Sequence, residues 1–139
     1  MPDQSTNDSI KLGIIGPVTY VSELKVKNLI YKLKAINVEL HSGGNLTGVE
    51  YYVKKYAMQF DIPYWEYNPA YTSHRLHSIF QPEWYDKVYY QTHDVHRYQI
   101  LIRNIDKLVI AVDSNFINWK MYIYLEKYAK KYKKPVIHI

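Results

Sequence analysis

Short apolar runs alternate with amphipathic segments along most of this chain, and that alternation constrains the fold more than any other feature. The expected strands are 11–16, 37–41, 62–67, 107–112 and 135–139. The expected helices between them begin near Ser22, Thr47, Asp94 and Asn118. Because parallel strands need crossover connections, which are usually helices, the pattern predicts an α/β domain whose parallel sheet is covered on both faces.

The segment after Thr47 is the clearest helix. Its apolar residues recur at steps of three and four: Val49, Tyr52, Val53, Tyr56, Ala57 and Phe60. Thr47 and Glu50 have the spacing of a capping box, which accounts for Glu50 without a ligand. Ser22 is the expected N-cap of the preceding helix. Pro63 favours an edge position for its strand, because an edge strand tolerates a missing N–H.

Length and composition predict one domain. The chain has 139 residues, and its 47% hydrophobic content exceeds what a disordered protein carries. Residues 1–10 are polar and are expected to form a flexible tail, so the domain spans 11–139. Residues 68–93 show no single period, are rich in Tyr, Trp and His, and form an excursion that is too long for an ordinary connector. We expect this excursion to be a lid or a subunit contact.

Several classes are excluded or disfavoured by composition. The absence of cysteine excludes disulfide frameworks, thiolate metal sites and a catalytic Cys. No apolar run approaches the ~18 residues of a membrane span, and the first ten residues lack a signal-peptide core, so we expect a cytoplasmic protein with no membrane partner. The net charge of +5 favours anionic partners. Much of the excess lies in one lysine run, which is typical of a solvated helix face: Lys127, Lys130, Lys131, Lys133 and Lys134.

Ligands of open parallel α/β sheets bind beyond the carboxyl ends of the strands. Three segments are therefore candidates: Gly16 to Tyr20, Ser42 to Gly48, and Asp113 to Asn115. The first two contain four of the five glycines, which allow the backbone N–H groups of a loop to approach a phosphate closely. The alternative is that both are ordinary turns between a strand and a helix.

At this point the residues resemble the SLOG superfamily of Rossmann-like nucleotide-binding domains. The resemblance is carried by Gly13-Ile-Ile-Gly16, by Ser42-Gly-Gly-Asn-Leu-Thr-Gly-Val-Glu50 and by Lys134-Pro-Val-Ile137. Arg97 and Asp106 match a further spacing of the family, ahead of an apolar strand. The chain looks most similar to the YspA-like branch, with DprA-like and LOG-like proteins as more distant relatives.

The resemblance implies a three-layer α/β/α fold with five parallel strands in the order 3-2-1-4-5. It also implies a nucleotide pocket over the glycine loops, with Arg97 contacting the anionic group, and no bound cofactor is expected. The ligand-binding residues predicted in this way are Gly16, Pro17, Val18, Thr19, Ser42, Gly43, Gly44, Asn45, Gly48, Glu50, Arg97, Asp113, Ser114 and Asn115.

The chain also departs from the family pattern. Pro17-Val18-Thr19 stands where YspA-like members usually have Ser-Arg, so one expected cation is missing. A Gly-Thr pair that often opens the last helix is replaced by Met121 and Tyr122. Related transferases and phosphoribohydrolases place a glutamate on this helix. The aligned position here is Leu125, and its neighbour Glu126 is a catalytic candidate whose side chain is rotated by about 100° from that position.

The excursion and the segment after it contain two H-x-x-H pairs, His74 with His77 and His93 with His96. Histidines at i and i+3 on a helix share a face that can bind a metal, but a polar, aromatic flap is the preferred interpretation, and no metal site is predicted. The abundant aromatic residues fit nucleobase stacking or a subunit interface, and they indicate a homo-oligomer, either a dimer or a dimer of dimers. Single-stranded nucleic acid is the alternative partner.

The sequence therefore predicts a module that senses or sequesters a nucleotide or nucleotide-derived small molecule without turnover. The competing hypothesis is an enzyme that cleaves or transfers an N-glycosidic bond, for which Glu50, Asp94, Asp113 and Glu126 are the available carboxylates.

Overall fold

The computed structural model describes residues 9–17, 20, 22–44, 47–67, 92–112 and 121–139. Most of the predicted excursion and the first eight residues of the predicted tail lie outside these ranges, as do His74 and His77. Thr92 and His93, which were assigned to the excursion, instead open a helix.

The sheet has five parallel strands. In chain order they are β1 (Ile10–Ile15), β2 (Val38–Ser42), β3 (Tyr64–Glu66), β4 (Lys107–Ile110) and β5 (Val136–His138). Their order across the sheet is β3-β2-β1-β4-β5, which confirms the predicted topology. The edge position of β3 also confirms the interpretation of Pro63, whose carbonyl accepts a hydrogen bond from the Leu40 N–H.

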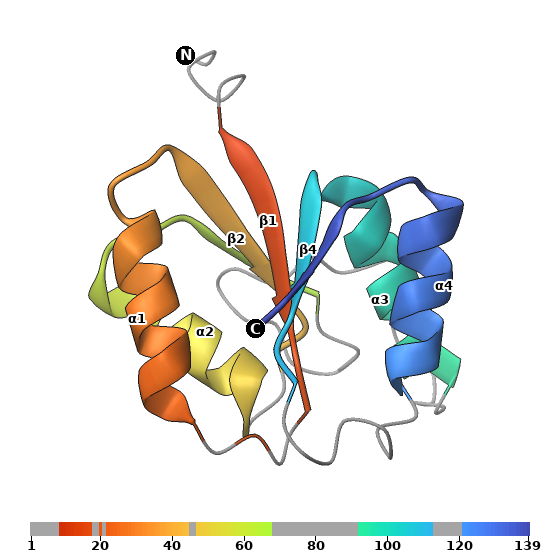
Figure 1. The fold of residues 1–139 in the computed structure, drawn as a ribbon, viewed down its shortest axis with the longest axis horizontal. Helices are drawn as coiled ribbons and strands as arrows, with labels where there is room; N and C mark the ends of the chain where they lie inside the picture. The colour runs from red at the N-terminus through yellow and green to blue at the C-terminus, as the bar shows by residue number, and fades with distance from the viewer. Residues whose placement is uncertain (1–8, 18–19, 21, 45–46, 68–91, 113–120) are drawn as a thin grey trace, which may run out of the picture.

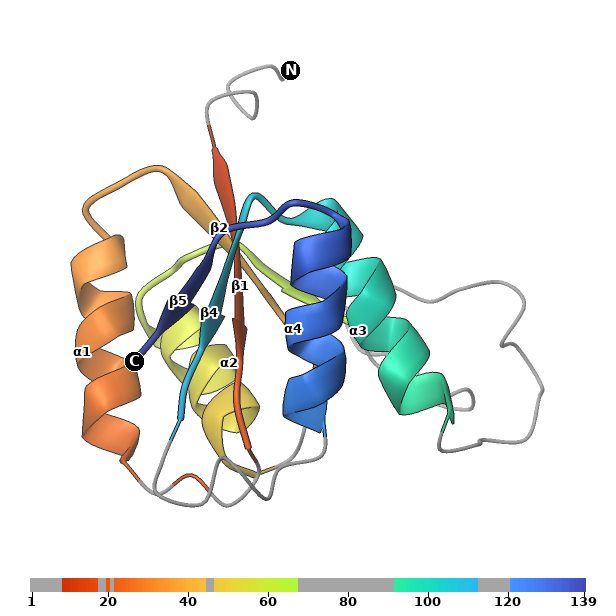
Figure 2. The same cartoon turned by 45° about the vertical axis from the view of Figure 1, so that its right-hand side comes forward.

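Four helices cover the described sheet in two layers (Figures 1 and 2). They are α1 (Glu23–Leu33), α2 (Val49–Gln59), α3 (Thr92–Asn104) and α4 (Met121–Lys131). Helices α1 and α2 lie on one face, whereas α3 and α4 lie on the other. This is the predicted three-layer α/β/α arrangement. None of these helices, within the described ranges, is long and apolar enough to cross a membrane.

The two faces of the sheet carry separate cores, because successive side chains of a strand point to opposite faces. In β1, Leu12 and Ile14 pack with Val26 and Ile30 of α1. Ile15 instead packs on the other face in a cluster with Leu101, Ile105 and Leu125. Burying each such side chain stabilises the fold by about 1.5–3 kcal/mol relative to exposure. These two cores hold the helices of each layer against the sheet.

The helix caps differ from the sequence-based expectation. Ser22 is the N-cap of α1 as predicted, but its side chain makes no capping hydrogen bond. The N-cap of α2 is Gly48, with φ 80° and ψ −153°, so the predicted Thr47–Glu50 capping box is wrong. Glu50 is fully buried and its side chain reaches across to α3. The spacing of Thr47 and Glu50 is typical of a capping box, but local spacing contains no information about a partner as distant in sequence as Tyr98.

Candidate functional site

The carboxyl ends of β1, β2 and β3 meet the starts of α1 and α2 at the lower end of the molecule in Figure 1. After β1, Gly16 and Pro17 are buried, and the Pro17 carbonyl accepts hydrogen bonds from the N–H groups of Tyr20 and Val49. The turn after β1 is therefore attached directly to the first residue of α2. A Cβ on Gly16 would overlap the Val49 side chain, which accounts for glycine at this contact.

The turn after β2 runs between two buried carboxylates. A Cβ added to Gly43 would overlap Oε1 of Glu50, and one added to Gly44 would lie 2.5 Å from Cδ of Glu66. Gly44 also has a φ of +81°, which L side chains rarely adopt. Both carboxylates are essentially inaccessible to solvent, at 0% for Glu50 and 1% for Glu66. The glycines are thus required by close contacts from both sides of the turn.

Arg97, on α3, holds this turn from inside the protein. Its Nη1 donates to the carbonyl of Gly43 and, at 3.4 Å, to the carbonyl of Tyr67, which follows β3. Its Nη2 donates to the hydroxyl of Tyr98 at 3.1 Å. The residue is only 4% exposed. Arg97 therefore ties the ends of β2 and β3 to α3.

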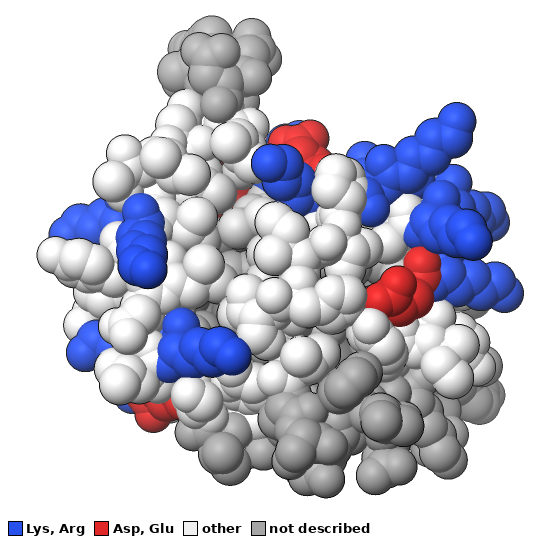
Figure 3. Space-filling view, in the orientation of Figure 1, with Lys and Arg blue, Asp and Glu red and all other residues white. Residues whose placement is uncertain are grey.

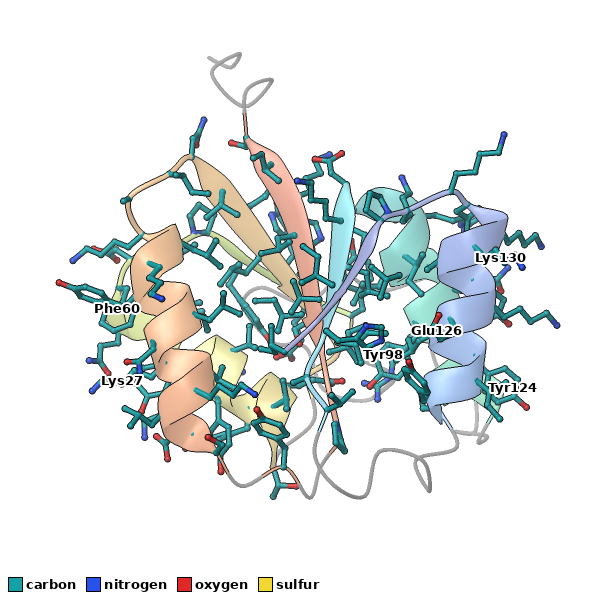
Figure 4. All side chains as sticks on the ribbon, in the orientation of Figure 1. Lys27, Phe60, Tyr98, Tyr124, Glu126 and Lys130 are labelled. Atoms are coloured by element: carbon teal, nitrogen blue, oxygen red, sulfur yellow. The ribbon has the colours of Figure 1, made fainter. Side chains whose placement is uncertain are left out.

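Tyr98 connects Arg97 to Glu50. Its hydroxyl accepts from Arg97 and donates to Glu50 Oε2 at 2.6 Å. Figure 4 shows Tyr98 in the interior, whereas Tyr124 and Lys130 point outward from α4. Because an ionised carboxylate only accepts hydrogen bonds, the Tyr98 hydroxyl supplies a donor that Glu50 needs in the interior. The result is a continuous buried chain from α2 to β2.

Glu66 is held by a second set of partners. The Tyr64 hydroxyl donates to Glu66 Oε1 at 3.1 Å, and Lys54 Nζ lies 3.4 Å from the same oxygen. Lys54 stands one turn after Glu50 on α2, and its side chain is partly exposed. The cation therefore reaches the buried carboxylate from the outer side of the turn.

A third polar chain lies on the α3 side of the sheet. His41 Nε2 bonds Glu39 Oε1 and its Nδ1 bonds the Tyr67 hydroxyl, both at 2.9 Å. Since the Glu39 carboxylate can only accept, Nε2 carries the proton and Nδ1 accepts from Tyr67. Burial lowers the pKa of His41 and raises the pKa of Tyr67 well above its usual range. The carbonyl of Tyr67 contacts Arg97, so this chain supports the same strand end.

The structure brings together eight of the fourteen predicted binding residues at this end of the sheet. They are Gly16, Pro17, Ser42, Gly43, Gly44, Gly48, Glu50 and Arg97. Ser42 is buried and donates to the carbonyl of Ile14 at 2.7 Å. Val18, Thr19, Asn45, Asp113, Ser114 and Asn115 lie outside the described residues.

The catalytic candidate Glu126 has its described contacts elsewhere. Its Oε1 lies 3.2 Å from His138 Nε2, which also bonds the Tyr122 hydroxyl at 2.8 Å. The side chain is 43% exposed. The hydrogen bond to Glu126 raises the pKa of Tyr122 to about 12. Among the described residues, this cluster joins α4 to β5 and not to the glycine turns.

Sequence reasoning missed Glu66, Lys54 and Tyr98. Glu66 stands two residues after the buried Tyr64 in β3, and a strand places such residues on the same face. Its burial could therefore have been predicted from the alternation of residues along the strand. Lys54 follows Glu50 by four residues on α2, but its partner is on another element. The residues around Tyr98 form no sequence pattern that indicates its hydrogen bond to Glu50.

The sequence matches no protein-family model and none of the curated proteins searched. Solved structures do match. DNA processing protein A of Helicobacter pylori is 17% identical with a TM-score of 0.69 over 95% of this chain. DNA processing protein A (DprA) of Streptococcus pneumoniae is 12% identical with a TM-score of 0.71 over 94%. A molybdenum cofactor carrier protein of Chlamydomonas reinhardtii is 16% identical with a TM-score of 0.66 over 94%.

This chain shares its Rossmann-like fold with these structures. The fold implied by the resemblance of the glycine motifs is thus confirmed. The chain covers 66% of the H. pylori protein, 50% of the S. pneumoniae protein and 76% of the C. reinhardtii carrier. The H. pylori structure is described as showing a single-stranded DNA binding mode, and the carrier is named for molybdenum cofactor. At these identities the matched structures establish the fold alone.

Proposed function

We propose that this chain binds a nucleotide or another phosphate-bearing, nucleotide-derived small molecule at the carboxyl ends of β1 and β2. The observation that carries the proposal is the buried polar support of the Gly43–Gly44 turn. Arg97, Glu50 and Tyr98 contact it from α3 and α2, and Glu66 contacts it from β3. Removing charged groups from water costs several kcal/mol per ion, so their concentration under one turn indicates that its conformation matters.

The peptide geometry of the turn supports this proposal. In a planar trans peptide, the carbonyl of one residue and the N–H of the next point in opposite directions. Arg97 draws the Gly43 carbonyl toward α3, so the following N–H is turned to the opposite side of that peptide. The start of α2 lies next to the same turn. Backbone N–H groups together with a helix N-terminus favour an anionic group.

The distribution of lysines favours a small molecule over nucleic acid. Among the described residues, exposed lysines form two groups on opposite sides of the molecule, Lys127, Lys130 and Lys131 on α4 and Lys25, Lys32 and Lys34 on or just after α1. Figure 3 shows basic side chains on both sides and no continuous basic track between them. Affinity for nucleic acid comes mainly from cations that contact successive phosphates. Among the known neighbours, the carrier of a small cofactor is therefore the better functional analogue than the DNA-binding protein.

The test is a nuclear magnetic resonance titration. Backbone amide spectra of the ¹⁵N-labelled protein would be recorded with nucleosides, mononucleotides, cyclic nucleotides and dinucleotides. We expect one class to shift the amides of Gly16, Gly43, Gly44 and Gly48, while the amides of Lys130 and Lys131 serve as the internal control. Shifts confined to α4 and β5, or no shifts with any class, would contradict the proposal.

The enzyme alternative needs a carboxylate at the sugar C1′. Glu50 is buried and bonded to Tyr98, and Glu126 contacts β5, so neither described carboxylate favours turnover. Incubation with each nucleoside and nucleotide, followed by chromatography for free base, separates the two functions. We expect no release of base, and release that is lost in Glu126→Gln or Glu50→Gln would establish the enzyme instead.

A further inference from the structure

The edge strand β5 has the largest share of exposed residues among the described strands. It pairs with β4 on one side and forms an edge of the described sheet. Ile137 is 47% exposed and His138 is also exposed, whereas β4 exposes only its first residue. β5 crosses in front of β4 in Figure 1, so Figure 3 views the molecule onto this edge. An exposed sheet edge is a template for pairing with another chain.

Alternate residues of β5 direct their backbone groups away from the sheet. The Pro135 carbonyl accepts a hydrogen bond from the Leu108 N–H, and the Ile139 N–H donates to the Ile110 carbonyl. The backbone groups at positions 135 and 139 therefore face β4. Val136 and His138 alternate with these positions, so each directs one N–H and one C=O group outward along the edge.

The edge is held in place from two sides. The His138 side chain bonds the Tyr122 hydroxyl at 2.8 Å and Glu126 at 3.2 Å, which attaches β5 to α4. The Ile139 carbonyl accepts from the Val112 N–H at 3.0 Å, beyond the last residue of β4. An incoming strand would therefore meet a preorganised edge and would lose little free energy in ordering it.

Helix α1 places two lysines on the side of β5. Glu23 and Lys27 both contact Tyr56 of α2, so they mark the side of α1 that faces α2. Because α2 packs over β1, β2 and β3, the opposite side of α1 faces the half of the sheet that ends in β5. Lys25 and Lys32, two turns apart and exposed, lie on that opposite side.

Two further lysines stand on the other side of β5. Glu126 contacts His138, so its side of α4 faces β5, and the exposed Lys130 follows it by one turn on that side. Lys133 is exposed in the turn that leads from α4 into β5. Figure 3 shows basic side chains to the left and right of a central white strip. The net charge of the whole chain, +5, has the same sign.

We propose that β5 is a docking edge for an extended acidic segment of a partner protein, which adds to the sheet as a further strand. The outward backbone groups of Val136 and His138 would supply the pairing, and Ile137 would contact an apolar residue of the segment. Asp and Glu residues of the segment would lie near the lysines of α1 and α4. This edge is separate from the glycine turns, so the proposal does not depend on the proposed ligand.

The lysines disfavour a second copy of this chain as the occupant. Two copies paired through β5 about a twofold axis normal to the sheet would keep each helix layer on its own face. The α1 helices would then meet with Lys25 and Lys32 from both copies, and like charges brought together at an interface are unfavourable. An acidic segment meets the same lysines with the opposite charge.

The first experiment measures peptide binding by fluorescence anisotropy. The probe is a labelled peptide of alternating Val and Glu, about ten residues long, the upper length of a typical strand. Its controls are the same peptide with Lys in place of Glu, the acidic peptide with N-methyl groups on its Val residues, and a labelled single-stranded oligonucleotide. We expect the acidic peptide to bind at least about tenfold more tightly than either control peptide. Equal binding of the acidic and N-methylated peptides would overturn the proposal.

Backbone variants test the strand pairing. Val136→Pro removes one outward N–H, and an edge strand tolerates proline, so we expect peptide binding to be lost while the fold remains. Ile137→Glu should weaken binding at least about tenfold. Met58→Glu is the matched control, because it adds the same charge at an exposed apolar residue of α2 and should leave binding within about twofold. If Val136→Pro does not fold, the comparison of Ile137→Glu with Met58→Glu decides.

Charge variants test the flanking lysines. Lys32→Glu should weaken peptide binding about three- to tenfold at low salt. Lys34→Glu is its control, because Lys34 is two residues away but lies beside Phe60, which follows α2. Equal effects of the two variants would contradict the docking position.

The remaining outcomes identify other occupants. If light scattering shows that Ile137→Glu, but not Met58→Glu, halves the mass of the protein, β5 pairs with a second copy and the proposal is wrong. If the oligonucleotide binds more tightly than the acidic peptide and Val136→Pro leaves its binding unchanged, the lysines form an anion surface without strand pairing, and the proposal is also wrong.

Discussion

The guanidinium of Arg97 donates a hydrogen bond to the backbone carbonyl of Gly43, a residue 54 positions earlier in the chain. This bond joins α3 on one face of the sheet to the turn that leads into α2 on the other face. Together with the hydrogen bond from Tyr98 on α3 to Glu50 on α2, it links both helices to the glycine turn.

Arg97→Lys should destabilise the protein and weaken ligand binding nearly as much as Arg97→Ala. An ammonium group cannot reproduce the planar fork that reaches two carbonyls and the Tyr98 hydroxyl. Leaving buried carbonyls unsatisfied costs about 1–3 kcal/mol. Urea unfolding measures the stability and calorimetry the affinity. Wild-type values for both in Arg97→Ala would show that this arginine supports neither the turn nor the ligand.

Tyr98→Phe should lower the free energy of unfolding by about 1–3 kcal/mol. The substitution keeps the ring but removes the hydroxyl that donates to the buried Glu50. Tyr124→Phe is the matched control, because Tyr124 is 42% exposed on α4 and its change should stay within about 0.5 kcal/mol (Figure 4). Equal effects of the two variants in urea unfolding would refute the bridging role of Tyr98.

Stability should fall as the pH drops below 6.5, the ordinary pKa of histidine. Burial lowers the pKa of His41 in the folded protein, so over this window the unfolded chain binds a proton that the folded chain does not. The contribution of His41 to stability is therefore fully present above pH 6.5. It is lost as the pH falls toward the lowered pKa of the folded protein, by at most about 1.4 kcal/mol per pH unit for one group. His41→Gln should flatten this slope in unfolding curves taken at successive pH values.

The chain should form a homo-oligomer in solution. Trp65 is 43% exposed on β3 and Ile123 is 71% exposed on α4, and large apolar side chains of this kind are frequent at subunit interfaces. Light scattering at micromolar concentration should give at least twice the 16.6 kDa of the chain. A mass equal to the single chain would show that these residues face solvent.

The topology could be predicted because each element carries its own pattern. The helical spacing in α2 and the apolar run of β4 are local, and the parallel order followed from the family resemblance of the glycine motifs. Strand ends were less predictable: β3 was expected over 62–67 but spans Tyr64–Glu66. Ends depend on which backbone groups find partners in the neighbouring strand, and the sequence of one strand does not contain that information.

The position of the candidate site was predicted from the sequence, but the roles of its residues were not. The turns after β1 and β2 were located from glycines, which mark close approach wherever they occur. The local spacing assigned Glu50 to a cap, and Arg97 was expected to face the ligand, whereas their described partners are Tyr98 and the Gly43 carbonyl. Such partners are distant in sequence, so they can be identified only from the three-dimensional structure.

Gly48 has a consequence for how binding defects in this protein are interpreted. Its backbone, at φ 80° and ψ −153°, lies in a region that is essentially restricted to glycine, and any side chain there adds about 1–3 kcal/mol of strain. Relief of this strain requires a change in the backbone of residue 48, immediately before the first turn of α2. A loss of binding in a Gly48 variant therefore does not by itself show that residue 48 touches the ligand.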